Sequence, residues 1–431
     1  MKSLSVNDIS QHPKYAKILL WTKLISITGS AQILVQALGM VTGILIIRLL
    51  STQEYAYYTI ANTMLGTMVI LSDGGIGIGV MTQGGKVWTD KNKLGSVMAT
   101  GLDLRNKFAA FSLIVSIPVL GYLLWHQGAP VWTIVFITVA LVPAFLSALS
   151  DSLLEIGPKL HQDIKPLQMN QVIVSIFRFI LSAGSLFFLP FTFIAILANG
   201  IPRIYGNLKL KKIANKFADE SQQPDPEHRE AILKIVKSTL PGSIYYCLAG
   251  QITIWLITLF GTTASIAQVG ALGRLSMILS IFSVLFATLL TPRFARFPSD
   301  KKLLLTRFLQ VLSAVVGFSL LTIALVYIAP FPFLWVLGKG YEGLNSELLL
   351  SMTGGCITLI SGSMYALATS RGWIMPPLIL ISLNLLAIAI GVALFDVSSL
   401  TGVLLLNILI GTVQVFMLGV FFLLKVKRIT N

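Results

Sequence analysis

Long apolar stretches with almost no charged side chains recur along the whole chain, separated by short polar segments. A run of about 20 apolar residues is long enough for a helix to cross the hydrocarbon core of a membrane. The pattern predicts about twelve membrane-spanning helices, over residues 24–47, 56–80, 108–125, 131–153, 168–189, 191–208, 240–260, 267–290, 308–329, 347–369, 376–395 and 400–424. Two longer apolar runs are each divided into two spans, near Pro190 and within 261–266, where turn-forming residues occur.

Composition supports the same class of protein. Hydrophobic residues make up 55% of the chain and charged residues 11%, whereas soluble domains have about 25% charged residues. The two cysteines, Cys247 and Cys356, lie in apolar runs without a CxxC pattern or a nearby histidine cluster, and both are expected to be small core residues. The chain is therefore predicted to be an all-α membrane protein without a disulfide framework, metal site or cofactor.

Basic residues are distributed unequally between alternate connections. The chain has 32 Lys and Arg against 17 Asp and Glu, a net charge of +15. If the N-terminal segment is cytoplasmic, 28 of the 32 basic residues fall on the cytoplasmic side, as expected for short loops of membrane proteins. This distribution predicts that both termini are cytoplasmic, and it accounts for the basic composition without a nucleic-acid partner.

The longest predicted cytoplasmic connection divides the chain near its middle. It gives an N-terminal bundle of six helices over residues 1–208, a linker over 209–239 and a second bundle of six helices over 240–431. Many transporters consist of two such halves with the cargo path between them. Within the linker, Asp225-Pro226-Glu227 predicts a helix start. The segment that follows is either an amphipathic helix on the membrane surface or a solvated linker.

A few arginines depart from the apolar background. Arg178 lies about ten residues into its span, near the midplane, and Arg274 lies about seven residues from the outer end of another. A charge at this depth must face a partner, a water-filled cavity or the interface. Both are candidate substrate-binding residues, or structural partners of acids or carbonyls. Arg48, at the first outer turn, is a third candidate, or else it locks that turn by pairing with Glu54.

Three acids lie within or beside the predicted spans. Asp73 is followed by several glycines and is a candidate for ion coupling, or for clamping a neighbouring helix. Asp151 and Glu155 lie at the cytoplasmic end of a span, where they are candidates for ion coupling or gating, or form interfacial pairs that include Lys159. The sequence alone leaves these alternatives open.

Several motifs carry a resemblance to a known family. The stretch from Arg48 to Tyr58 (RLLSTQEYAYY) and the later Leu71-Ser-Asp-Gly-Gly75 resemble the opening of polysaccharide-exporter flippases of the multidrug/oligosaccharidyl-lipid/polysaccharide exporter superfamily. The segments 270–277 (GALGRLSM) and 291–294 (TPRF) are similar to features of the second half of that family. Ser51, Ala56 and Gly74 depart from the family pattern.

The resemblance implies a MATE-like, V-shaped pair of bundles around a central cavity that works by alternating access. It implies a flippase, not an enzyme, that translocates an undecaprenyl-diphosphate-linked oligosaccharide, such as an O-antigen or exopolysaccharide repeat unit, across the bacterial inner membrane. Arg178, Arg274 and Arg48 would bind the cargo, and Asp73, Asp151 and Glu155 would couple ions or gate. The expected partners are membrane lipids, with a glycan polymerase or other assembly protein as a candidate, around a monomeric transport unit.

Other functions remain as alternatives. A cation-coupled multidrug exporter of the same superfamily would favour acids within the membrane, whereas the deepest charges here are arginines. A polymerase or lipid-linked glycosyltransferase would usually carry a large outer loop with catalytic residues, and the longest predicted outer loop, 329–346, is short. A non-transporting membrane component of glycan assembly is a further alternative. Either the membrane potential or an ion could drive transport.

Overall fold

The computed structural model describes residues 13–428, apart from 292–293, 295–296, 299, 372 and 374. The described chain is helical, as the apolar pattern predicts. Its helices are α2 (Pro13–Leu49), α3 (Thr52–Asp73), α4 (Ile76–Val87), α5 (Lys91–His126), α6 (Val131–Leu154), α7 (Ile156–Leu160), α8 (Ile164–Phe188), α9 (Thr192–Ala214), α10 (Pro226–Phe260), α11 (Thr263–Ser276), α12 (Ile278–Leu289), α14 (Lys301–Ile328), α15 (Pro330–Leu337), α16 (Asn345–Ser370), α17 (Pro377–Leu394) and α18 (Leu400–Lys427), with a short 3-10 helix, η1 (Lys339–Tyr341).

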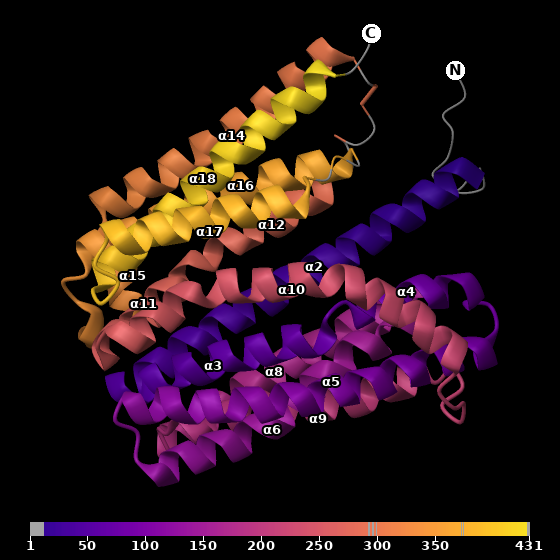
Figure 1. Ribbon diagram of the computed structural model, residues 1–431, viewed down its shortest axis with the longest axis horizontal. Helices are drawn as coiled ribbons and strands as arrows, with labels where there is room; N and C mark the ends of the chain where they lie inside the picture. Colours follow the sequence, from indigo (N-terminus) through magenta and orange to yellow (C-terminus); the bar gives the residue numbers. More distant parts are fainter. Residues whose placement is uncertain are drawn as a thin grey trace, which may run out of the picture.

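The long helices form two groups, which Figure 1 shows as a lower and an upper layer. In the first bundle, α2 packs on α8, α8 on α9, α9 on α6, and α3 on α5 and α6. In the second, α16 packs on α14 and α18, α17 on α18, and α12 on α16. Helices α2 and α10 run between the layers (Figure 1) and contact both groups.

Nine described helices are long and apolar enough to cross a membrane, and the bent pair α3 and α4 provides a tenth. Helix α9 packs along α6 and α8, and α10 contains the apolar segment Gln251–Phe260. Counting these two gives the expected number of about twelve.

Two ends of the molecule are distinguished below. The distal end carries α15 and the turns between α2 and α3, α5 and α6, and α10 and α11, at the left of Figure 1. The proximal end carries the C-terminal end of α18 and the connection between α9 and α10, at the right. The sequence prediction assigns the proximal end to the cytoplasm.

The second long helix of the first bundle is sharply bent, whereas that of the second bundle is interrupted by a single turn residue. Helix α3 ends at Asp73, and the chain passes through Gly74 and Gly75, whose φ angles of 49° and 98° place them in the left-handed region. Helix α4 then leaves at 43° to α3. Helix α11 ends at Ser276, and α12 begins at Ile278. Met277, which lies between them, keeps right-handed helical dihedral angles, and Thr263–Ser283 is one continuous span.

Helix α10 begins where the sequence predicts. The Asp225 carboxylate caps it by accepting from the Glu227 amide at 2.7 Å, and Pro226 occupies the first turn. Two residues of its apolar face are packed inside the protein. Ile232 and Val236 are buried in a cluster with residues of α4 and α5, because the glycines of α4 let the helices approach closely. An added Cβ at Gly79 would lie only 2.8 Å from Ile232.

The expected loop between the second and third spans is also largely helical. Helix α5 begins at Lys91, with its N-terminus capped by Asp90, instead of near residue 108. Arg105, assigned to a cytoplasmic loop from sequence, is therefore a buried residue of α5. Cys356 is buried as predicted, whereas the side chain of Cys247 and the residues Pro292 and Arg293 of the family-like turn lie outside the described residues.

Candidate functional site

Arg178 lies on α8, ten residues from its distal end, which corresponds to about 15 Å at 1.5 Å per residue. Its side chain is half-buried, and its Nε is buried without a hydrogen-bonding partner. No hydrogen bond or ion pair joins Arg178 to the residues that the structure describes. Its charged neighbours are Arg203, Arg274 and Asp151.

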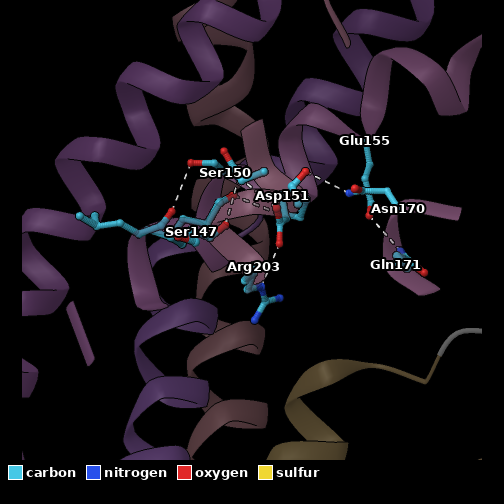
Figure 2. A network of polar contacts seen from close by, with 12 residues as sticks. Ser147, Ser150, Asp151, Glu155, Asn170, Gln171 and Arg203 are labelled. Carbon is cyan, nitrogen blue, oxygen red and sulfur yellow. Dashed lines mark hydrogen bonds and ion pairs between the residues drawn. The ribbon is translucent and has the colours of Figure 1, made fainter. Parts of the chain in front are cut away.

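Arg203 of α9 is paired within the first bundle. Its Nε donates to Oδ2 of Asp151 at 2.8 Å, as Figure 2 shows. The other oxygen of Asp151 accepts from Asn207 Nδ2 at 3.0 Å. Both carboxylate oxygens of Asp151 therefore bond to side chains of α9, and this carboxylate does not neutralise Arg178 directly.

Arg274 extends from α11 toward the first bundle. Its guanidinium lies near Tyr55 and Tyr58 on α3, and its Nη1 lies 3.6 Å from Met277 Sδ. A Cβ at Gly43 of α2 would stand 3.1 Å from its Cδ. Gly43 is six residues, or about 9 Å, from the distal end of α2. Arg274, two residues before the end of α11, thus reaches across the interface between the two bundles.

The surroundings of Arg178 carry a positive charge. Three arginines, from α8, α9 and α11, face one paired aspartate. Tyr58 lies near Arg178 and Arg274. It accepts from Asn199 Nδ2 at 3.2 Å and lines a small, mostly apolar pocket that also includes Asn62 and Asn199. The site is suited to an anion that also accepts hydrogen bonds from neutral groups. Among the described residues, no group of three His, Cys, Asp or Glu side chains could hold a metal ion.

Asp73 lies away from this cluster, at the break between α3 and α4. It forms an ion pair with Arg105 and accepts from the Gly77 amide at 3.1 Å. Arg105 also donates to the Leu149 carbonyl and, at 2.7 Å, to Ser152 Oγ. These contacts match the interpretation of Asp73 as a helix clamp.

Glu155 directly follows α6 and forms an ion pair and a hydrogen bond. Lys159 Nζ lies 2.6 Å from its Oε2, which matches the expected interfacial pair. Gln171 Nε2 donates to its Oε1 at 3.0 Å, and Figure 2 shows both residues beside Asp151. Gln171 in turn accepts from Gln32 of α2 at 2.8 Å. Glu155 therefore lies at one end of a chain of carboxamides.

Arg48 and Glu54 do not pair with each other, contrary to the turn-locking interpretation. Arg48 donates to the carbonyls of Val336, at 2.8 Å, and Trp335, and its guanidinium lies 4.9 Å from the Trp335 ring centroid. Glu54 accepts from the amide and hydroxyl of Thr192, both at 2.6 Å. Both side chains therefore bond to residues that are distant in the sequence. The hydrogen bonds of Arg48 join α2 to α15 at the distal end.

Another hydrogen-bonded contact joins the bundles at the distal end. Gln127, just after α5, donates to the Thr258 carbonyl at 2.7 Å and accepts from Thr263 Oγ1 at 2.9 Å. Together with the contact of Arg48, these hydrogen bonds hold the distal ends of the two bundles against each other. We call this set, Arg48 with α15 and Gln127 with Thr258 and Thr263, the distal clasp.

Sequence reasoning missed several residues of the site, although a pattern marks them. Asn199, Arg203 and Asn207 recur every four residues on α9 and so share one face. Gln168, Gln171, Ser175 and Arg178 recur at three- and four-residue spacing on α8. A search for polar stripes on apolar helices would have found both faces.

No protein-family model matches the sequence, and no curated protein matches it. Solved structures do match the fold. An inward-facing multidrug resistance MATE family transporter of the MOP superfamily has 16% sequence identity, with 92% of this chain and 96% of that chain covered and a TM-score of 0.73. An outward-facing MATE family transporter has 15% identity, with 100% and 99% covered and a TM-score of 0.63.

A third similar structure is a MOP superfamily transporter from Pyrococcus furiosus, described as having a binding pocket of reverse polarity that suggests a different function. Its identity is 14%, 94% of this chain and 96% of that chain are covered, and the TM-score is 0.58. The chain therefore has the MATE-like fold that the sequence predicts. At these identities the likeness establishes the fold and leaves the cargo to be argued from the residues of the site.

Proposed function

We propose that the protein is a membrane transporter that carries an amphiphile with an anionic head group by alternating access. The observation that carries this proposal is Arg178, a cation deep in the helical bundle with no protein partner in the described chain. Arg203 and Arg274 add positive charge around it, and only Asp151 opposes them. A positive site in low-dielectric surroundings favours an anion, which removes the cost of the unpaired charge.

The chemistry of arginine narrows the class of anion. Its planar guanidinium forms paired, charge-assisted hydrogen bonds with phosphate groups. A diphosphate bound to both Arg178 and Arg274 would relieve the repulsion between these two cations of α8 and α11. A lipid tail could stay in the bilayer while the head group passes between the bundles.

The specific cargo we propose is an undecaprenyl-diphosphate-linked oligosaccharide, moved across a bacterial inner membrane. This choice rests on the family resemblance of the motifs at 48–58 and 71–75, together with the positive site. Outward movement of a negative head group is favoured by an inside-negative potential, by about 2.3 kcal/mol per charge per 100 mV.

Cation-coupled multidrug export is a second candidate, favoured by the likeness of the fold to multidrug resistance transporters. A cationic drug needs accessible acids, whereas Asp73 and Asp151 are each bound to an arginine. For the similar Pyrococcus furiosus protein, a binding pocket of reverse polarity is described as suggesting a different function. The polarity of the site therefore favours the anionic cargo.

The test is a transport assay with purified protein in liposomes. The two probes are a fluorescent undecaprenyl-diphosphate-linked saccharide, followed with a membrane-impermeant quencher, and ethidium as a cationic drug. The unaltered protein should move the lipid and not ethidium. Arg178→Ala and Arg274→Ala should each slow lipid movement roughly tenfold or more, since a hydrogen bond to a charged group contributes about 1.5 to 3 kcal/mol.

Arg307→Ala serves as the matched control. Arg307 is exposed on α14 and its guanidinium donates to Gln310 at 2.9 Å, so its loss should leave the rate unchanged. Transport of ethidium alone by the unaltered protein would establish the multidrug candidate instead. Normal lipid transport by both site variants would show that these arginines do not bind the cargo.

A further inference from the structure

A polar stripe on α2 faces the interface between the bundles. Gly29, Gln32, Gln36, Gly39 and Gly43 follow one another at alternating spacings of three and four residues, so they lie on one side of the helix. The close approach of Gly43 to Arg274 of α11 shows that this side is turned toward the second bundle. At Gly39, an added Cβ would meet no heavy atom of the described residues within 4 Å. The stripe therefore borders open space near the middle of the helix.

The stripe meets the polar face of α8 toward the proximal end. Gln32 Nε2 donates to Gln168 Oε1 at 3.1 Å and to Gln171 Oε1 at 2.8 Å. Gln171 Nε2 then donates to Glu155. We call these four residues, Gln32, Gln168, Gln171 and Glu155, the amide cluster. It places carboxamides of two helices and a carboxylate that follows a third in one continuous network.

Gln36 continues the polar face of α2 beyond the amide cluster but forms no hydrogen bond with it. It lies one turn, about 6 Å, distal to Gln32 on the same face of α2. Its side chain is half-buried, and no hydrogen bond joins it to the described part of the chain. Arg178 lies about 10 Å distal to Gln171 on α8. Because Gln32 fixes α2 against α8 in parallel register, Gln36 lies at a depth between the amide cluster and Arg178.

The chemistry of these groups suits a neutral, hydroxyl-rich ligand. A carboxamide offers a donor and an acceptor together, and a hydroxyl group offers one donor and two acceptor sites. A polar side chain within the apolar slab is costly unless it is satisfied. Gln36 therefore needs water or a ligand to complete its hydrogen bonds. A cationic or purely apolar ligand would not use both functions of the amide.

We propose that Gln36 and the amide cluster form a sugar subsite, proximal to the anion site at Arg178. This proposal rests on the proposed function and adds to it: the diphosphate lies at the arginines while the first sugar lies against α2 and α8. Gln36 is the specificity residue of this subsite, because its amide forms no hydrogen bond with the described residues. The residues of the amide cluster hold α2 against α8 and thereby orient Gln36.

The test compares the binding of farnesyl diphosphate with that of farnesyl diphosphates carrying glucose, galactose or N-acetylglucosamine, on the full protein in detergent. The unaltered protein should bind at least one sugar conjugate roughly five- to tenfold more tightly than farnesyl diphosphate, the effect of one or two neutral hydrogen bonds. Gln36→Leu should remove this gain and leave the affinity for farnesyl diphosphate unchanged. Arg178→Ala should weaken the binding of every probe.

The unfolding temperature of each variant, measured in the same detergent, shows whether it is folded. Gln414→Leu is a matched control, since Gln414 bonds to Asn384 between α17 and α18, away from α2. The Gln414→Leu variant should still bind the sugar conjugate more tightly than farnesyl diphosphate. If no sugar conjugate binds more tightly than farnesyl diphosphate, or Gln36→Leu keeps the gain, the subsite is refuted and the anion site stands. If farnesyl diphosphate does not bind the unaltered protein, the proposed function itself fails.

Discussion

The arginines inside the first bundle differ in whether the protein itself accepts their hydrogen bonds. Arg105 is only 2% exposed and is held by Asp73, the Leu149 carbonyl and Ser152. Arg178 has no such acceptor within the described residues. A guanidinium with unmet donors is costly in an apolar environment. Arg105 therefore serves the stability of the bundle, whereas Arg178 is free to bind a ligand.

Asp73→Ala should lower the free energy of unfolding by about 2 kcal/mol, because it leaves the buried charge of Arg105 unpaired. The expected loss is below that of a fully buried pair, since the Asp73 side chain is 34% exposed. Thermal unfolding in detergent measures it, and the double variant Asp73→Ala with Arg105→Met should recover part of the loss. A variant of normal stability that no longer transports would instead support ion coupling by Asp73.

Gly39→Leu should preserve folding but block the passage of cargo, because its side chain would enter the open space on the inner face of α2. The unfolding temperature and the transport rate distinguish these effects. Gly206→Leu is the contrasting variant: an added Cβ there would lie 2.3 Å from Val174, so it should destabilise the protein. Undiminished transport by Gly39→Leu would place the cargo path elsewhere.

The sequence identified some site residues and missed others for physical reasons. Arg178 and Arg274 stand alone in apolar runs, so the cost of burying a charge marks them. Arg203 was counted with the cytoplasmic basic residues although it falls within the predicted span 191–208, because charged residues follow it closely, and α9 continues through that stretch to Ala214. The partners of Arg48 could not be predicted, because backbone carbonyls nearly 290 residues away leave no pattern in the sequence.

At the scale of elements, the break between α3 and α4, the continuous span of α11 and α12, and α10 do most to position the site. The glycine pair after Asp73 bends the second long helix of the first bundle by 43°, whereas Met277 keeps α11 and α12 together as one span beside Arg274. Hydropathy predicts the first of these helices as continuous, because a glycine pair does not change the apolar pattern. The start of α10 was predictable from its cap and proline, but its burial depended on the small residues of α4.

Ile232→Ala should lower the free energy of unfolding by about 3 kcal/mol, the usual cost of truncating a buried isoleucine. Ile232 is fully buried between α10 and α4, so the loss should appear in thermal unfolding in detergent, without a bilayer. Lys234→Ala, at an exposed position of the same helix, should have little effect. If Ile232→Ala unfolds at the normal temperature and only binds membranes less well, α10 begins on the membrane surface after all.

At the scale of the whole molecule, the two bundles are joined at the distal end by the distal clasp. With the proximal end on the cytoplasmic side, as the sequence predicts, this clasp would close the outer side of the molecule.

Arg48→Ala should shift the protein toward an outward-open state, because it removes the hydrogen bonds from α2 to the carbonyls of α15. Spin labels at Trp132→Cys and Glu342→Cys, both exposed near the distal end, would report the distance between the bundles in a background with Cys247 and Cys356 replaced by alanine. Arg48→Ala should increase the population with longer distances. An unchanged distribution would mean that the clasp does not hold the bundles together.

The composition of the distal clasp also bears on how the cycle is triggered. Its partners are a guanidinium, a carboxamide, a hydroxyl group and backbone carbonyls, none of which gains or loses a proton under ordinary conditions. Acidification outside the cell would therefore leave this barrier as strong as before. We expect this barrier to respond to the arrival of cargo or to the membrane potential, and to protons only through a titratable group elsewhere in the protein.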